Sequence, residues 1–538
     1  MKCIHMAVLL VLIAAATIHP ASSTAPDQAD AGITFSLNAS NDLVDAMPGD
    51  GICETAAGND MCTLRAAIME ANAHIGDDII LLPAATYLLT ITGVGEDASA
   101  TGDLDVTESL TLIGESADTT IIDASSLSDR VLQVSNNVET VEISHLTLTH
   151  GQTSGEGGGI FTSASLELHN VQVYSNNAGS VGGGIFGNAP LSINRSYIAS
   201  NSAQTGGGIY ANKHLTIINS IIEGNHTDTS GGGLFLLGLG TPVSINDTIF
   251  NANTAQDYGS AIYNFGDEVD LDQSVMSNNI GGYAGAIYNA GDGTFLLNDS
   301  TVISNTSNKY GGGLYNAAGF MSLLAVTVTA NHTEIGGGIT NMDSMEVTNS
   351  TISGNTASSN GGGIYNSGTT SVNNSTIVNN MASSGGFSGD GGGVYADPAS
   401  TFTFKNTILF NNHHRRLLSI IDDDCYGTLT TAHYNLVGVL DNCTLTGSSG
   451  LDLIGVDPLL GPLADNHGPT FTHALQSGSP AIDSANPQGC FEGQVQLKFD
   501  QRGLLRHWDG NGDGTVRCDI GSFEYGSKML IFLPITRK

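Results

Sequence analysis

The stretch GGGIYNSGTTSVNNSTIVNN, residues 361–380, is one copy of a pattern that occurs ten times along this chain. Each copy ends on an anchor asparagine, and successive anchors are 24 to 32 residues apart. The anchors are Asn176, Asn201, Asn225, Asn253, Asn279, Asn305, Asn331, Asn355, Asn380 and Asn412. In every copy an apolar residue stands three positions and eight positions before the anchor. A third stands ten positions before it in all copies but one (Thr370), and this spacing of two is the period of a β-strand.

The repeat length indicates the kind of solenoid. Short β-branched runs and frequent glycines exclude a helical repeat. A repeat of about 25 residues accommodates three short strands and three turns, which make one coil of a parallel β-helix. Coils stack about 4.8 Å apart, so equivalent positions form ladders, and the anchor asparagines are expected to bond coil to coil at a turn. We therefore predict an all-β fold, a right-handed parallel β-helix.

Composition limits the partners of the chain. Only 13% of the 538 residues are charged, and the 16 Lys and Arg against 52 Asp and Glu give a formal net charge of -36. This charge disfavours binding to nucleic acid or to an anionic membrane. Residues 1–25, MKCIHMAVLLVLIAAATIHPASSTA, combine a lysine, an apolar run and small residues, which is typical of a secretory signal and too short for a membrane span. The chain is expected to be exported as a monomer that is not an integral membrane protein.

Six cysteines remain after Cys3 in the signal segment, and all six lie outside the repeats. An even number of cysteines in an oxidising compartment indicates disulfides. Sequence neighbours suggest Cys53–Cys62, Cys425–Cys443 and Cys490–Cys518, although six cysteines allow about fifteen pairings. These bonds would stabilise the two ends of the solenoid, where a stack of repeats would otherwise fray.

We divide the chain into seven segments. We predict a signal peptide (1–25), an N-terminal cap (26–76), irregular opening coils (77–156), regular β-helix repeats (157–412), a disulfide-held insertion (413–450), a C-terminal cap (451–526) and a tail (527–538). Within the N-terminal cap, MCTLRAAIMEANAHIG (61–76) places Leu64, Ala67, Ile68 and Ala71 on one helical face. Such a helix can cover the open first coil, with its apolar end and unpaired strand edges.

Three segments resemble known families. DGIC and MCTLRAAIMEANAHIGDDIILLPAATYLLT, within 50–90, resemble the N-terminal CSLREA segment of bacterial secreted β-helix proteins, from which Thr63 and Ala66 depart. DPLLGPLADNHGPTFTHALQSGSPAID and DQRGLLRHWDGNGDGTVRCDIGSFEY are similar to the choice-of-anchor Q domain, with His467 where glycine is usual. The Gly-Gly-Gly-Ile and Asn-ending repeat resembles polymorphic outer-membrane proteins and pectin-lyase-like folds. These resemblances imply export and a pectin-lyase-like solenoid, but they identify no catalytic residues in this chain.

Two clusters of ionisable residues are candidates for catalysis. Enzymes on such folds commonly cleave acidic polysaccharides with clustered carboxylates and a basic residue, and Asp270 and Asp272 in GDEVDLDQS are the carboxylate candidates. The repeat register places Asp270 between Ser244 and Leu296, so these carboxylates do not stack across coils. A solvated acidic face is the alternative interpretation.

The second cluster, NNHHRRLLSIIDDDC (411–425), interrupts the coil pattern. Its residues His413, His414 and Arg415 are candidates for general acid–base chemistry. The alternative is a structural loop held by a disulfide, with its charges in water.

DGNGDGTVRCD (509–519) resembles the first half of a calcium loop. Asp509, Asn511 and Asp513 offer oxygens at alternating positions, as in loops that surround one cation. The twelfth position is Ile520 rather than a carboxylate, and Asp519 stands one residue early as a fourth candidate ligand. A structural calcium ion is therefore the cofactor that this loop suggests.

An aromatic column accompanies the glycine-rich segment of the repeats. The residue after the aliphatic position is aromatic in nine of ten copies, with Thr340 as the exception. The tyrosines of this column are Tyr210, Tyr263, Tyr288, Tyr315, Tyr365 and Tyr395, and its phenylalanines are Phe161, Phe186 and Phe235. Because neighbouring strand residues alternate between faces, the column should point outward. Outward rings could stack against sugar rings, or they could form a ladder that stabilises the solenoid.

These observations favour an exported surface or extracellular rod that binds glycans or neighbouring cell-surface material. The first alternative is a calcium-dependent polysaccharide lyase or glycoside hydrolase on the same fold. The second is a structural spacer, which a covered aromatic column would favour.

Overall fold

The computed structural model describes residues 32–238, 240, 242–383, 389–416, 419–447, 449–492 and 495–527. The expected signal peptide (1–25) and all of the expected tail except residue 527 lie outside the described residues.

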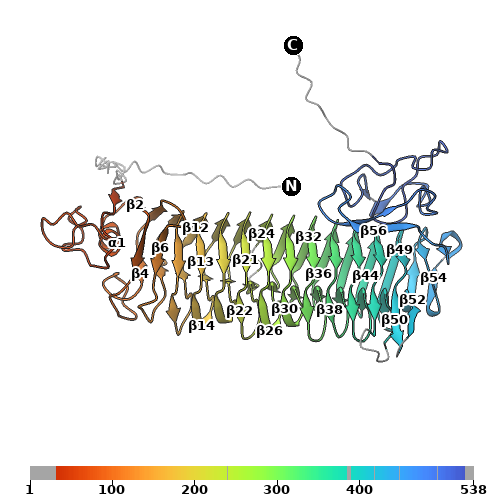
Figure 1. Cartoon of the computed structure of the whole chain (residues 1–538), viewed down its shortest axis with the longest axis horizontal. Helices are drawn as coiled ribbons and strands as arrows, with labels where there is room; N and C mark the ends of the chain where they lie inside the picture. The colour runs from red at the N-terminus through yellow and green to blue at the C-terminus, as the bar shows by residue number, and fades with distance from the viewer. Residues whose placement is uncertain are drawn as a thin grey trace, which may run out of the picture.

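Three long sheets run along an elongated rod (Figure 1). Sheet A has 28 described strands, sheet B has 15 and sheet C has 12. In a central coil, β31 (Ile287–Ala290) and β32 (Thr294–Asn298) lie in sheet A, β33 (Thr301–Ile303) in sheet B and β34 (Thr306–Ser307) in sheet C. Strands pair with their equivalents in the next coil, and β31 thus pairs in parallel with β27 (Ile262–Phe265) and with β35 (Leu314–Asn316). The all-β parallel β-helix is confirmed.

The core of the rod is a set of apolar columns, because alternate residues of each strand point inward. The column expected three positions before each anchor includes Val173, Ile198, Phe250 and Val302, all fully buried. Neighbouring members of the column pair across coils, as Val173 does with Ile198. The repeat register read from the sequence therefore matches the register of the strands.

The anchor asparagines form a continuous buried ladder. Asn305 is typical: its Nδ2 donates to Oδ1 of Asn331 at 3.0 Å and to the carbonyl of Met276 at 2.9 Å. Its Oδ1 accepts from both the backbone N–H (3.0 Å) and Nδ2 (2.9 Å) of Asn279. The ladder ends at Asn412, whose backbone N–H and Nδ2 donate to the carboxylate of Asp424. Burial raises the pKa of Asp424 to about 6.

A second asparagine ladder lies inside sheet A and was not predicted. Each member donates through Nδ2 to Oδ1 of the next, at 2.8 to 3.1 Å. The members are Asn264, Asn289, Asn316, Asn341 and Asn366, each of them fully buried. In the sequence they follow the aromatic column directly, or follow Thr340 where that column is interrupted.

Helix α1 (Leu64–Ala73) lies at the N-terminal end of the rod (Figure 1). It forms where the apolar face was predicted, and Thr63 caps it by accepting from the backbone N–H of Ala66. Arg65 is fully buried, and its Nε donates to Asp42 at 2.6 Å. The other guanidinium nitrogens donate to the carbonyls of Ser99, Gly102 and Asp103, so this buried charge is paired and satisfied.

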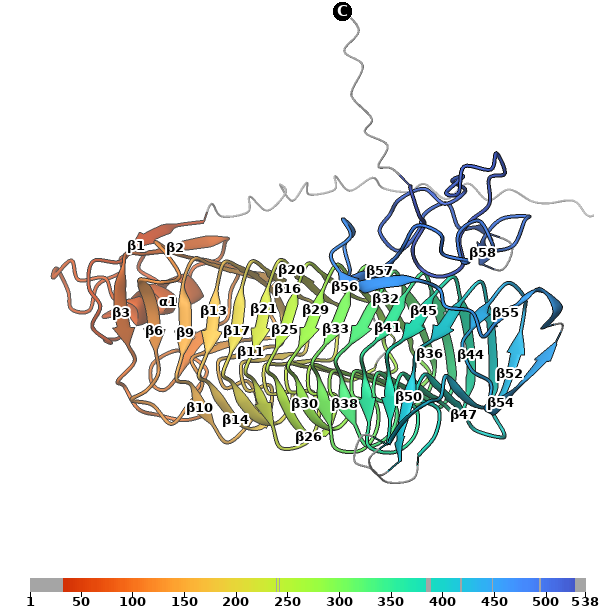
Figure 2. The same ribbon diagram turned by 45° about the vertical axis from the view of Figure 1, so that its right-hand side comes forward.

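The C-terminal segment folds back along the side of the solenoid instead of covering its end (Figure 2). It contacts an outward column of threonines in sheet B: Thr327 in β37 (Thr327–Thr329), Thr351 in β41 (Thr351–Ser353) and Thr376 in β45 (Thr376–Val378). Thr351 donates to Oε1 of Gln501 at 2.6 Å, and Gln501 Nε2 donates back to Thr327 at 3.0 Å. In earlier coils the same column contains Ile221 and Ile249, which are 39% and 41% exposed. The column therefore changes from exposed isoleucines to threonines in the coils on which the C-terminal segment docks.

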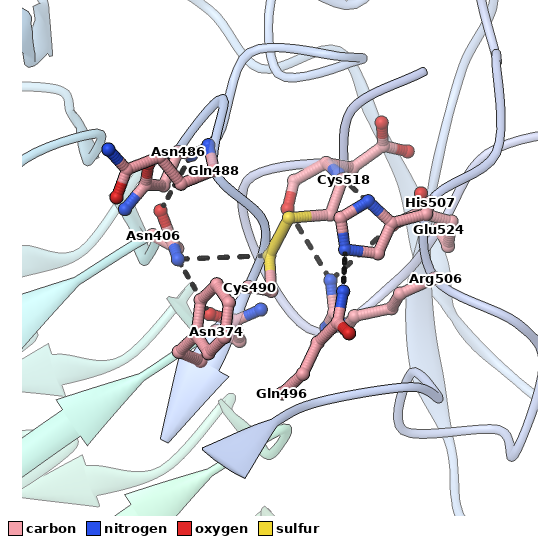
Figure 3. The surroundings of a disulfide bond; sticks show 12 residues. Asn374, Asn406, Asn486, Gln488, Cys490, Gln496, Arg506, His507, Cys518 and Glu524 are labelled. Carbon is pink, nitrogen blue, oxygen red and sulfur yellow. Dashed lines mark hydrogen bonds and ion pairs between the residues drawn. A yellow bond between two sulfur atoms is a disulfide. The ribbon is translucent and has the colours of Figure 1, made fainter. Parts of the chain in front are cut away.

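All three expected disulfides are present: Cys53–Cys62, Cys425–Cys443 and Cys490–Cys518. The first two lie at the two ends of the solenoid, as predicted. The third lies within the folded-back segment, beside the buried Asn406 (Figure 3). Asn406 Nδ2 donates to Oδ1 of Asn374 at 2.9 Å and lies 3.7 Å from Cys490 Sγ. This disulfide therefore stabilises the docked segment rather than a fraying end of the coil stack.

Candidate functional site

The aromatic column forms a ladder of stacked rings on the outward face of sheet A. Its residues occupy the middle of short three-residue strands such as β11 (Ile160–Thr162) and β19 (Ile209–Ala211), or the second position of slightly longer ones such as β27 and β31. Successive centroids from Phe161 through Tyr288 are 4.8 to 5.5 Å apart, with the rings within 26° of parallel. Thr340 interrupts the ladder, which resumes at Tyr365 and Tyr395 and extends to Tyr426.

The rings of the ladder are half-buried, except for Phe186, which is buried. Each ring stacks on its neighbours, and the half-buried residues stay partly exposed to solvent. Stacked aromatic pairs contribute about 0.5 to 1.5 kcal/mol beyond their burial, so the ladder stabilises the rod. The predicted outward direction is confirmed, because the strand neighbours of these residues, such as Ile209 and Ile287, are fully buried.

Three further tyrosines, which were not predicted, widen the ladder in its central part. Tyr258, Tyr283 and Tyr310 each stand five residues before a ladder tyrosine, which is the sequence signal that could have revealed them. Tyr258 lies 4.7 Å from the ring of Tyr288, and Tyr310 lies 5.7 Å from that of Tyr315.

We call these three residues, together with Tyr263, Tyr288 and Tyr315, the tyrosine cluster. All six rings are half-buried. Lys309 Nζ lies 5.8 Å from the centroid of Tyr283, within the range of a cation–π contact.

Burial raises the pKa of three tyrosines of the cluster, Tyr263, Tyr288 and Tyr315. It raises the pKa of Tyr315 to about 12, with a further contribution from Tyr310, and it raises the pKa of Tyr288 as well. The hydroxyl groups of these three tyrosines therefore stay protonated at physiological pH. Each presents an apolar ring edge beside a hydroxyl that can donate or accept a hydrogen bond, which is the combination that a sugar ring requires.

An open groove of about 450 Å³ adjoins the first ring of the ladder. It is lined by Phe161 together with polar side chains that include Gln133, Asn136, Asn137 and Asp97. The guanidinium of Arg130 lies 5.2 Å from the Phe161 centroid. Amides, a carboxylate and an aromatic ring thus converge at one end of the ladder, as they do in many sites that orient polar ligands.

The candidate carboxylates Asp270 and Asp272 lie in β28 (Glu268–Asp272) of sheet A. The register is as predicted: Asp270 pairs with Ser244 on one side and with Leu296 on the other. Asn298 donates to Asp270 and Asn246 donates to Asp272, both at 3.1 Å. Burial, and to a smaller extent Asp270, raises the pKa of Asp272. The two carboxylates are thus solvated by amides on the sheet face and are not stacked with other carboxylates.

The histidine cluster divides between two faces of one strand. β50 (His413–Arg416) pairs antiparallel with β51 (Ser419–Asp422) at the end of sheet C. His413 is partly exposed and its Nδ1 lies 3.1 Å from Asp422, while Arg415 is exposed. His414 points inward and is only 2% exposed. The structure therefore does not gather His413, His414 and Arg415 around one substrate position, and it places them on a different sheet from Asp270 and Asp272.

The candidate calcium loop is closed by its own backbone. Both carboxylate oxygens of Asp509 accept from backbone N–H groups of residues 512–514, and Asn511 Oδ1 accepts from the backbone N–H of Asp513. The two oxygens of Asp519 accept from the backbone N–H groups of Asp483 (2.7 Å) and Tyr525 (2.5 Å). Calcium on Asp509, Asn511, Asp513 and Asp519 stays a prediction.

Comparison with known proteins finds a matching repeat family and a solved structure that aligns with this chain. The family described as the Chlamydia polymorphic membrane protein repeat matches residues 349–367, which is less than one coil. No curated protein matches the chain. The crystal structure of pectate lyase Pel9A aligns over 93% of this chain and 98% of the other chain, with 12% identity and a TM-score of 0.27. At that TM-score the likeness carries no argument about activity.

In the described part of the chain, no helix is long and apolar enough to cross a membrane.

Proposed function

We propose that this protein is an exported β-helical rod of the cell surface that binds glycans along its aromatic ladder. The observation that carries the proposal is the half-buried stack of rings on sheet A, widened to two tyrosine rows in the tyrosine cluster. The half-buried tyrosine cluster includes Tyr315, whose raised pKa keeps its hydroxyl protonated, and a polar groove adjoins the ladder at Phe161. A rod of repeated coils offers a repeating ligand the same contact many times over.

Several features support a surface location. The segment 1–25 has the composition of a secretory signal, and the three disulfides suit an oxidising compartment. The repeat family that matches residues 349–367 is named for a membrane protein of Chlamydia. We also propose that the N-terminal and C-terminal segments are related to the CSLREA and choice-of-anchor segments that they resemble. We propose further that α1 covers the first coil and that the rod is right-handed, as crossovers between parallel strands almost always are.

The enzyme alternative has less support from the candidate residues. Elimination or hydrolysis of an acidic glycan on this fold needs carboxylates gathered with a basic residue. The carboxylates of Asp270 and Asp272 accept hydrogen bonds from the side-chain amides of Asn298 and Asn246. His414 is buried beneath the surface that a polymer could reach.

The test is a binding assay that scores cleavage separately. The chain without residues 1–25 is incubated with acidic and neutral polysaccharides, and bound and released sugar are measured. We expect retention without cleavage, and at least about tenfold weaker binding for the double variant Tyr263→Ser/Tyr288→Ser, since sugar–ring contacts contribute roughly 1 kcal/mol each. The matched control is Tyr197→Ser, a half-buried tyrosine of sheet B.

Equal binding by the double variant and the control would refute the ladder as the binding surface. Retention of no polysaccharide at all would favour the structural spacer. Release of shortened sugar would establish an enzyme instead.

A further inference from the structure

A buried histidine lies between two aspartates where the last coil of sheet C meets the insertion. His414 is in β50, which pairs in parallel with β46 (Met381–Ala382) and antiparallel with β51. Asp390 belongs to the turn that precedes β47 (Val394–Ala396), and Asp423 directly follows β51. The hairpin of β50 and β51 therefore meets the segment before β47 at this point.

The three side chains are close enough to share one ion. A ring nitrogen of His414 and one carboxylate oxygen each of Asp390 and Asp423 all lie within 4.8 Å of one another. His414 Nδ1 is 2.9 Å from Oδ2 of Asp423. The same Oδ2 accepts from the backbone N–H of Gly391 at 2.6 Å, and Oδ1 accepts from Asn442 Nδ2 at 3.2 Å. The Asp423 carboxylate is thus held in a fixed orientation.

Burial distinguishes this group from an ordinary surface ion pair. His414 is 2% exposed and Asp423 is 1% exposed. The second ring nitrogen of His414, Nε2, is buried and has no hydrogen-bond partner among the described residues. A buried imidazole with only one nitrogen satisfied is costly unless something else compensates for its burial. An ion shared with the two carboxylates would bind Nδ1, the ring nitrogen that faces Asp423, and its attraction to the buried carboxylates would offset that cost.

We propose that Asp390, His414 and Asp423 bind a divalent transition-metal ion of the zinc type. One imidazole nitrogen with two carboxylate oxygens is a donor set that zinc accepts, whereas calcium prefers oxygen ligands alone. Three protein ligands leave a fourth position for water.

The ion has a route to this site. The Asp390 side chain is 28% exposed, and its partner Arg416 lies 3.7 Å away with a side chain that is 61% exposed. An exposed ion pair of this kind is weak, so the Arg416 guanidinium can be displaced by a stronger ligand for Asp390.

The bound ion fixes the insertion to the coil stack. It joins the Asp390 turn, the β50 strand and the segment that leads into β52 (Cys425–Thr431). The next residue after Asp423 is Asp424, which terminates the ladder of anchor asparagines. Metal binding therefore stabilises the last rung of the ladder through the adjacent residue. This role is structural and is independent of glycan binding on sheet A.

The experiment uses tag-free protein without residues 1–25, dialysed against a chelator. Calorimetric titration with Zn²⁺, Mn²⁺ and Ca²⁺ measures affinity, and elemental analysis after gel filtration measures the metal content. We expect one Zn²⁺ per chain, weaker binding of Mn²⁺ and no binding of Ca²⁺ at this site, together with a rise in the unfolding temperature on adding Zn²⁺.

Two variants and one control test the ligands. Asp390→Asn changes a partly exposed residue and should fold, and His414→Asn removes the imidazole; each should weaken Zn²⁺ binding at least about tenfold. The matched control is Asp422→Asn, an exposed neighbour whose loss should leave the affinity unchanged. The absence of a stoichiometric site, or equal affinity in Asp390→Asn and the control, would overturn the proposal. Circular dichroism confirms that each variant is folded before titration.

Discussion

Removing one rung of the anchor ladder is expected to destabilise the rod strongly, and Asn305→Ala is the sharpest change. Asn305 is fully buried in the middle of the ladder and takes part in four hydrogen bonds through its side chain. Alanine fits the space but replaces none of them. The variant leaves two buried donors of Asn279 without an acceptor and the carbonyl of Met276 without this donor.

The magnitude follows from these orphaned groups. A buried polar group that loses its partner costs about 1 to 3 kcal/mol. Two orphaned donors and a weakened carbonyl give an expected loss of about 3 to 6 kcal/mol in the free energy of unfolding. This is a large fraction of the stability of an ordinary domain.

The assay is equilibrium unfolding in urea, followed by far-UV circular dichroism of the full mature chain. Asn308→Ala is the matched control, because Asn308 lies three residues further on and is exposed. Exposed substitutions usually change stability by less than about 0.5 kcal/mol. A loss below about 1 kcal/mol for Asn305→Ala, or a loss equal to that of the control, would show that the ladder is not a stabilising network.

Two further predictions concern pH and the docked segment. Burial raises the pKa of Asp424 to about 6 and that of Asp105 to about 8. The folded chain retains these protons where the unfolded chain has released them, so the free energy of unfolding should increase as the pH falls from about 8 to about 5, by up to about 1.4 kcal/mol per pH unit for each group. Thermal unfolding across this range checks the sign, and a lower unfolding temperature at the acidic end would contradict it. The variant Gln501→Ala should loosen the C-terminal segment, because it removes hydrogen bonds to Thr327 and Thr351. Hydrogen exchange should then rise at residues 327–351 and remain unchanged in the early coils, and equal protection in both proteins would refute this docking contact.

The register of the coils could be predicted because a solenoid is nearly one-dimensional. Each residue packs against its equivalent one repeat away, so spacing in the sequence becomes spacing in the structure. The neighbours of Asp270, the outward direction of the aromatic column and the asparagine ladder all followed from counting. The row formed by Tyr258, Tyr283 and Tyr310 carries the same periodic signal, although it was not predicted.

Segments outside the repeats could not be placed in this way, because no periodicity relates them to the coils. The C-terminal segment was expected at the end of the rod, and it docks instead on a column of threonines whose hydroxyls satisfy its polar groups. His414 was predicted as an acid–base residue, and burial between Asp390 and Asp423 gives it a different environment.

The amino-acid sequence by itself therefore determined the architecture of this protein: parallel coils, a buried ladder of asparagines and an outward row of rings. The two-residue period of the strands and the stacking of equivalent positions in successive coils are sufficient to predict these features. Only the tertiary structure decided which residues from different segments meet, as Asp390, His414 and Asp423 do. Such contacts depend on how loops and the C-terminal segment close over the coils, and neither their length nor their composition encodes that path.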